Sequence, residues 1–287
     1  MNATCLACHF QKSVETALTI GGEPAATAFA TELIQAYLSA PKNAASPYFN
    51  PIVEALLTKH CGLQGDRYAE DKRISNQFVL ERMDKIRELV ARQADPVYAG
   101  LQFSILGNYL DFSALGKQLS FETLDDMLRS ALDMELDRSC YDALCCDLSQ
   151  GKRLLYLTDN AGEIGFDRIF AEQIALRYPQ LEITFCVRGG PTLNDATRED
   201  AAVVGVPFPV IDNGTCYGGT VLPEIGQEAK TALEQADVII AKGMGNVETM
   251  YGCQYNVYYA FLVKCAYFIQ LFQKPLMTPM LLRQRSE

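Results

Sequence analysis

The chain has 287 residues, of which 49% are hydrophobic and 21% are charged, and both fractions are ordinary for a globular protein with a substantial core. Its formal net charge of −10 argues against nucleic acid or an anionic membrane as the main partner, because both bind clustered positive charge. No apolar run is long enough to span a bilayer, and Met1 to Phe10 does not read as a signal peptide. We therefore expect a cytoplasmic protein with no membrane or nucleic-acid partner.

The first half of the chain has mostly helical apolar spacing. Val79, Met83, Ile86 and Val90 fall at steps of four, three and four, which predicts one helix with a single apolar stripe. The apolar residues between 121 and 132 repeat this spacing. No convincing strand pattern occurs there, so the sequence predicts an all-helical domain over residues 1–149.

The second half alternates short apolar runs with helix-like stretches, which predicts βαβ units and a parallel sheet covered on both faces. This α/β domain is expected over residues 150–287. The predicted strands are Leu154–Thr158, Ile183–Val187, Phe208–Ile211 and Val238–Ala241, and the predicted helices are Glu163–Arg177, Asn194–Val204 and Pro223–Ala236.

Polar or glycine-rich sequence follows each predicted strand, and parallel sheets bind ligands at the carboxyl ends of their strands. After the first strand, Asp159 and Asn160 supply the hard oxygen atoms that magnesium and manganese prefer. The same residue types also cap helices, and Glu163 begins the next predicted helix. Both interpretations stay open for this segment.

The second strand is followed by Arg188, two glycines and Asp195. Arg188 could bind a phosphate through two parallel hydrogen bonds, and Asp195 could complete a metal site. Taken alone, the segment is more typical of a turn followed by a capped helix.

The fourth strand ends at Lys242, and Gly243, Gly245 and Asn246 follow it. Free backbone N–H groups in such a loop can form an anion site beside the lysine. The loop is not a phosphate-binding Walker motif, and no dinucleotide-binding glycine pattern opens the first turn. If these strand ends converge, they form a metal-plus-phosphate site, in which the cation activates a water molecule. Asp159 could instead attack phosphorus directly.

Ten cysteines occur in the chain, and we expect them to be reduced because no export signal is evident. Cys186 and Cys265 lie in apolar runs, which indicates buried thiols. Cys5 and Cys8 form a Cys-x-x-Cys pair with three open interpretations. The pair could be inert, it could bind a metal together with His60 or Cys61, or it could be redox-active.

Several of these segments together resemble one known family, the damage-control phosphatases, formerly domain of unknown function 89. The resemblance rests on segments 159–167, 188–197 and 242–246, read in this order. The pair Cys5 and Cys8, the segment from Gly107 to Asp111, and Lys264-Cys265 resemble its cysteine-pair subfamily.

The resemblance implies a Rossmann-like three-layer α/β/α sandwich with an N-terminal all-helical domain. It implies a divalent cation (Mn, Ni, Co or Mg) held by Asp159, Asn160 and Asp195. It also implies hydrolysis of small phosphate monoesters, such as sugar phosphates or damaged phosphometabolites. Asp159 and Lys242 would act in catalysis, with Lys242 contacting the phosphate. The pocket would be lined by Glu163, Arg188, Asn108, Asn246, Gly243 and Gly245.

One position departs from the family pattern, because Met244 stands where many relatives have glutamine. Because methionine is apolar, this difference concerns the substrate preference more than the metal binding. Two other functions stay open. A non-catalytic metal- or metabolite-binding protein would keep the lysine and the glycines. A carboxyl methyltransferase would need a glycine-rich turn after the first strand, where this chain has only Gly162 and Gly165.

Overall fold

The structure is a computed structural model, and it describes residues 1–110, 128 and 130–284. In this part of the chain, six strands form one sheet in the order β3-β2-β1-β4-β5-β6. Neighbouring strands are parallel except for β6, which runs antiparallel to β5 at the edge. The strands are β1 (Arg153–Leu157), β2 (Glu182–Val187), β3 (Val210–Asp212), β4 (Val238–Lys242), β5 (Val257–Leu262) and β6 (Pro279–Gln284).

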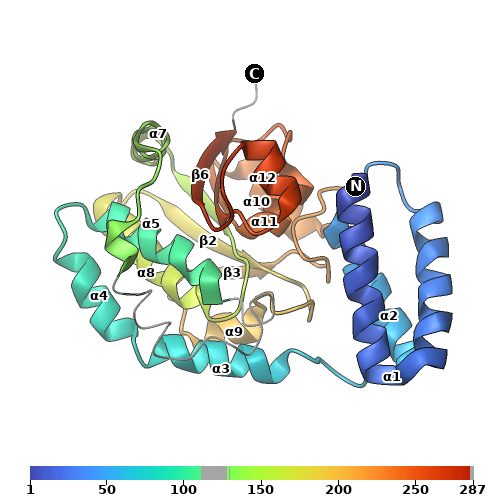
Figure 1. The fold of residues 1–287 in the computed structure, drawn as a ribbon. Coiled ribbons are helices and arrows are strands. Elements are labelled where there is room, and N and C mark those ends of the chain that lie inside the picture. The colour runs from blue at the N-terminus through green and yellow to red at the C-terminus, as the bar shows by residue number, and fades with distance from the viewer. Residues whose placement is uncertain (111–127, 129, 285–287) are drawn as a thin grey trace.

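Helices cover both faces of the sheet (Figure 1), as the alternating side chains of the strands require. Leu154 and Tyr156 of β1 pack on one face, whereas Leu155 and Leu157 pack on the other. The expected three-layer α/β/α sandwich is therefore confirmed. The first face carries α5 (Pro96–Gly107), α7 (Arg138–Gln150), α8 (Glu163–Arg177) and α9 (Arg198–Val203), and the second carries α10 (Gln227–Gln235), α11 (Gly243–Met250) and α12 (Ala266–Phe272).

The N-terminus forms a helical lobe with its own small core, beside the sandwich (Figure 1). The lobe consists of α1 (Ala3–Ser39), η1 (Ser46–Phe49) and α2 (Asn50–Cys61). Gly22 has a positive φ of 72° and breaks α1 into two arms. The two arms lie side by side, and His9 on the first arm is hydrogen-bonded to Tyr37 on the second. None of the described helices is long and apolar enough to cross a membrane.

The predicted single helix with the stripe from Val79 to Val90 is wrong, because the stripe is divided between α3 (Ala69–Leu80) and α4 (Met83–Ala91). A turn at Glu81 and Arg82 separates the two helices, and both pack on α8. The stripe residues remain buried in one cluster, so burial was predicted correctly although the helix bounds were not. Most of the other predicted stripe, between residues 121 and 132, lies outside the described residues.

All elements described before β1 are helices, joined by loops, so the expected N-terminal helical region is present. However, α5 and α7 pack on the sheet and contribute to its first covering layer. The division into domains at residue 149 stays a prediction. Two short 3-10 helices, η2 (Asn108–Leu110) and η3 (Ala131–Asp133), complete this part.

Candidate active site

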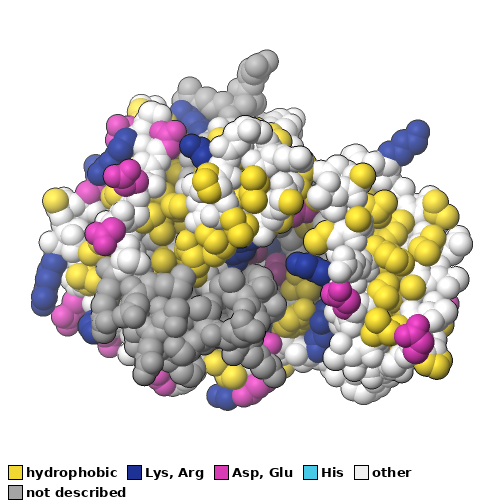
Figure 2. All heavy atoms as spheres, in the orientation of Figure 1, with side chains coloured by type: hydrophobic (Ala, Val, Ile, Leu, Met, Phe, Trp, Pro, Cys, Tyr) yellow, Lys and Arg dark blue, Asp and Glu magenta, His cyan; other side chains and the backbone are white. Residues whose placement is uncertain are grey.

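The candidate site lies where the strand order of the sheet reverses. β1 is paired with β2 on one side and with β4 on the other, so the carboxyl ends of all three strands meet there. Open α/β sheets bind ligands at such a switch point. A cavity of about 690 Å³ opens at this place, and its wall includes Asn108, Asp159, Asn160 and Asp195. The helical lobe forms the opposite wall, and Figure 2 shows the recess between this lobe, on the right, and the rest of the molecule.

Two asparagine amides hold the carboxylates of Asp159 and Glu163 together. The Nδ2 atom of Asn108, at the end of α5, donates to Oδ2 of Asp159 and Oε2 of Glu163, both at 2.9 Å. The Nδ2 atom of Asn160 donates to the same two oxygens at 2.9 and 2.7 Å. Burial raises the pKa of Asp159 well above its usual range, and the charges of Glu163 and Asp195 raise it further. A cation bound here would relieve this repulsion.

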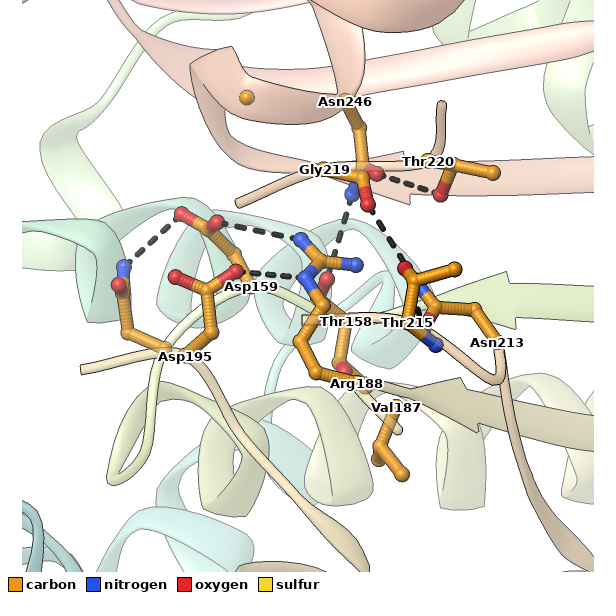
Figure 3. A network of polar contacts seen from close by, with 12 residues as sticks. Thr158, Asp159, Val187, Arg188, Asp195, Asn213, Thr215, Gly219, Thr220 and Asn246 are labelled. Carbon is orange, nitrogen blue, oxygen red and sulfur yellow. Dashed lines mark hydrogen bonds and ion pairs between the residues drawn. The ribbon is translucent and has the colours of Figure 1, made fainter. Parts of the chain in front are cut away.

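Arg188 connects the carboxylates that follow two different strands (Figure 3). Its Nε donates to Oδ2 of Asp195 at 2.6 Å, and its Nη2 lies 3.8 Å from Oδ1 of Asp159. Only 1% of the arginine side chain is exposed. An isolated antiparallel bridge between Asn160 and Asp195 also joins the two loops. The three predicted metal ligands are therefore brought together, as the order of the strand ends indicated.

Lys242 lies behind the cavity wall in a buried network. Its Nζ donates to the carbonyl oxygen of Ser104 at 2.8 Å, to Glu163 at 2.7 Å and to Asp167 at 2.6 Å. Burial alone would lower the pKa of Lys242, but the two carboxylates outweigh this effect and raise it. Burial raises the pKa of Asp167 to about 6, although the Lys242 ammonium opposes this shift. All three N–H donors of the ammonium group are thus already engaged within the protein.

Gly243 allows the loop after β4 to pass directly against Asp159. Its φ is +74°, and an added Cβ would lie 2.0 Å from Oδ2 of Asp159. At Gly245, an added Cβ would lie 2.0 Å from the carbonyl oxygen of Gly218. Both positions therefore need glycine for close backbone approach, and Gly245 also lines the cavity.

Asn246 fastens the loops together instead of facing the cavity (Figure 3). Its Nδ2 donates to the carbonyl oxygens of Thr158 and Lys242, and its Oδ1 accepts from the hydroxyl of Thr220 at 2.8 Å. The described cavity wall does not include five of the residues predicted to contact substrate or phosphate, and all five are buried behind it. They are Glu163, Arg188, Lys242, Gly243 and Asn246.

Lys264 supplies a positive charge in the cavity that reasoning from the residues alone did not identify. It lies two residues after β5, and its Nζ donates to the carbonyl oxygen of Asn108. Its charge also opposes the rise in the pKa of Asp159. Lys264 follows the end of a strand, and this position had identified Lys242 as a candidate. Because β5 was not predicted from the sequence, Lys264 was not recognised in the same way. The family resemblance did include this lysine, as part of the Lys264-Cys265 segment.

The helical lobe places Cys5 and Cys8 in the same cavity. His60 is paired with Glu32, and the thiol of Cys61 donates to the carbonyl oxygen of Ala17, so neither is directed to the cysteine pair. The prediction of a buried thiol is confirmed for Cys186 but is wrong for Cys265, which is half-buried and lines the cavity. Asp111 lies outside the described residues.

The residues at the site fit a divalent cation. Among the described residues, no three His, Cys, Asp or Glu side chains are grouped so that they could hold a metal ion. The predicted set has two carboxylates, Asp159 and Asp195, and takes its third oxygen from the amide of Asn160. Because Nδ2 of Asn160 faces two carboxylates, its Oδ1 is the atom left for a ligand. Hard oxygen donors of this kind suit magnesium or manganese with water in the remaining positions.

Comparison with known proteins agrees with this fold. A family model described as the damage-control phosphatase ARMT1-like domain matches residues 1–278. The chain belongs to this family. A damage-control phosphatase from Archaeoglobus fulgidus is 35% identical over 188 residues, which are 64% of each chain. A damage-control phosphatase from Pyrococcus horikoshii is 30% identical over 174 residues, which are 59% of each chain.

The alignments with these two damage-control phosphatases thus span less than two thirds of their length. The fold is shared over the whole chain. A crystal structure of a DUF89 family protein from Pyrococcus horikoshii matches with a TM-score of 0.84 and 25% identity, and the match covers 99% of both chains. The resemblance stated from the sequence is therefore confirmed, both for the family and for the fold.

Proposed function

We propose that this damage-control phosphatase family member is a metal-dependent hydrolase of small phosphate monoesters. The observation that carries the proposal is the convergence of Asp159, Asn160 and Asp195 on one cavity that Lys264 also lines. Carboxylates and an amide would hold a cation, and the lysine would face the negative charge of a phosphate. The names of the Archaeoglobus and Pyrococcus relatives support a phosphatase.

In this proposal, Asp159, Asn160 and Asp195 hold the divalent cation (Mn, Ni, Co or Mg). When bound, the cation would neutralise phosphate charge and lower the pKa of a water molecule that attacks phosphorus. The protein's own contribution is to fix its oxygen atoms in place. Asn108 holds the carboxylate of Asp159, and Arg188 holds that of Asp195. Such fixed side chains need little rearrangement when substrate binds.

The two lysines have different roles in this proposal. Lys242 neutralises Glu163 and Asp167 behind the site, which lowers the negative charge next to the cavity wall. Lys264 faces the cavity next to Asn108 and contacts the phosphate. This assignment differs from the expected phosphate contact of Lys242, because the donors of Lys242 are all engaged.

The cavity fits a small metabolite. Its volume of about 690 Å³ lies within the usual range for small-molecule sites. The wall from the helical lobe is largely polar and includes Lys12, Thr16 and Asn50, and Arg67, which follows α2, adds a positive charge. Hydroxyl groups of a sugar phosphate would find hydrogen-bonding partners there. We therefore propose sugar phosphates or similarly polar phosphometabolites as the substrate class.

The experiment that tests this function is an assay of metal-stripped protein with p-nitrophenyl phosphate. Magnesium, manganese, cobalt and nickel are added in turn to the wild type, to Asp159→Ala and to Asp84→Ala. The last variant is a matched control, because the side chain of Asp84 is 97% exposed on α4. We expect metal-dependent turnover in the wild type and in Asp84→Ala but not in Asp159→Ala. Absence of turnover with every metal and with a panel of sugar phosphates, in folded protein, would favour a binding protein instead.

A further inference from the structure

Three thiols from two distant parts of the chain line the same cavity. Cys5 and Cys8 belong to the first arm of α1, and their spacing of three residues places them on one side of this helix. Cys265 is the residue that precedes α12. Helices α1 and α12 are in contact, so the fold brings together cysteines that lie 260 residues apart in sequence.

The electrostatics of the three thiols show that they are neighbours. Burial, followed by the charges of Glu248, Cys265 and Cys8, raises the pKa of Cys5 to about 11. The pKa of Cys265 is also raised, first by burial, then by Glu248 and Cys8. The pKa of Cys5 therefore responds to Cys8 and Cys265, the pKa of Cys265 responds to Cys8, and Glu248 lies beside them in the same cavity. All three are free thiols in this structure.

Their exposure differs in a way that suits stepwise oxidation. Cys8 is exposed, whereas Cys5 and Cys265 are half-buried. An oxidant in solution reaches Cys8 first. A half-buried thiol next to it can then react with the oxidised sulfur, because a sulfenic acid condenses readily with a nearby thiol.

We propose that a peroxide joins Cys265 to the cysteine pair of α1 in a disulfide, which fastens α1 to α12 beside the cavity. In the first step the sulfur of Cys8 attacks hydrogen peroxide, becomes a sulfenic acid and releases one water. In the second step the sulfur of Cys265 attacks the sulfenic sulfur and releases a second water. Two thiols thus lose two electrons and two protons, and one peroxide is reduced to two waters.

The disulfide would restrain the helical lobe against the sandwich. The first arm of α1 contributes His9 and Lys12 to the cavity wall, so the bond would hold this wall in place. It would also close a loop of more than 250 residues, and long loops give the largest stabilisation by a cross-link. Formation of the bond does not depend on the proposed phosphatase activity, so the two proposals can fail separately.

The test uses the full chain, treated with an equimolar amount of hydrogen peroxide and then with N-ethylmaleimide to block the remaining thiols. Trypsin releases residues 1–12, which contain both α1 cysteines, and residues 265–283, which contain Cys265 as their single cysteine. We expect mass spectrometry to find these two peptides linked, and dithiothreitol to separate them. We also expect oxidation to raise Tm by about 5 °C.

Two variants make the test specific. Cys265→Ser should lose both the linked peptides and the rise in Tm, whereas Cys146→Ser should keep both, because Cys146 is an exposed thiol on α7. A bond confined to residues 1–12, or no disulfide in folded protein, overturns the proposal. Protection of all three thiols from N-ethylmaleimide by added zinc, with no linked peptides after peroxide, would overturn it in favour of a metal site.

Discussion

The backbone at Gly243 passes so close to Asp159 that a Cβ on the glycine would lie 2.0 Å from Oδ2 of the carboxylate. No side chain can be accommodated there unless the carboxylate or the loop moves. The loop after β4 and the carboxylate after β1 therefore fix each other's position at the switch point of the sheet. The Asp159 carboxylate, which we propose as a metal ligand, therefore has little freedom to adopt another rotamer.

We predict that Gly243→Ala lowers kcat/KM for p-nitrophenyl phosphate at least about 100-fold, because a shift of about 1 Å in a catalytic group has an effect of this size. The loss of stability should be only about 1–3 kcal/mol, which reflects a non-glycine residue at positive φ together with the displaced carboxylate. Steady-state kinetics and urea unfolding measure the two effects.

Gly62→Ala is the matched control for this variant. Gly62 follows α2 with a φ of +71°, close to the +74° of Gly243, but an added Cβ would have no atom within 4 Å. Gly62→Ala should therefore lose stability by about 1 kcal/mol and keep full activity. Equal activity of Gly243→Ala and Gly62→Ala would show that close approach to Asp159 is unimportant.

Lys264 and Lys242 should respond differently to substitution. Lys264→Ala should lower kcat/KM about 100-fold, as expected for the loss of one charged donor facing the reacting group, and change Tm by less than about 2 °C. Lys264→Arg should restore part of the activity, because it restores the charge. Wild-type kinetics in Lys264→Ala would contradict its contact with the phosphate.

Lys242→Met should instead destabilise the fold, because Glu163 and Asp167 would remain buried without their cation. Breaking a buried pair in this way costs about 3–5 kcal/mol, which corresponds to a fall in Tm of roughly 10 °C. Lys59→Met is the control, since Lys59 forms an exposed ion pair with Glu32 and should change stability by less than about 1 kcal/mol. Circular dichroism during heating measures both variants. A Lys242→Met protein that is stable but inactive would contradict this role and would support a direct contact between Lys242 and the phosphate.

Glu248 should make stability depend on pH. Burial raises its pKa from 4.5 to about 7, and the N-terminal ammonium only partly opposes this shift. Because the folded state binds this proton more tightly than the unfolded state, its contribution to stability is complete below pH 4.5 and is lost as pH rises through about 7. Glutamine does not titrate, so Glu248→Gln should become more stable than the wild type over this pH window.

Urea unfolding of both proteins at several values between pH 4.5 and 8 tests this prediction. The difference in the free energy of unfolding should be small at pH 4.5, grow up to about pH 7 and then level off. A difference that is constant over the whole range would mean that Glu248 does not titrate in this window.

The parallel part of the sheet was predictable because apolar runs and polar strand ends repeat along the second half. The helix Glu163–Arg177 was predicted with its observed bounds. By contrast, β5 was missed because only Lys264 interrupts the apolar sequence between its six buried residues and α12, and no glycine or proline marks the change. The edge strand β6 was missed as well, and it pairs only with β5.

The grouping of Asp159, Asn160 and Asp195 was also predictable, because it follows from topology alone. The direction of side chains was not, because it depends on partners that are distant in sequence. Arg188 faces carboxylates, and Lys242 faces Glu163 and the carbonyl oxygen of Ser104 from α5. The positions of the strand ends identify which residues lie together at the carboxyl edge of the sheet. The packing of their side chains determines which of them reach the cavity.

Metal binding should be detectable without any substrate. Manganese at about 100 times its Kd should stabilise the wild type by about 2.7 kcal/mol, a rise in Tm of roughly 5 °C or more. Asp159→Asn should lose this response, yet its metal-free form should be at least as stable as the metal-free wild type. The reason is that asparagine removes a buried charge that Glu163 and Asp195 repel. Asp84→Asn, at an exposed position, should respond to manganese like the wild type. An unchanged manganese response in Asp159→Asn would exclude this carboxylate as a ligand and move the cation to another part of the cavity.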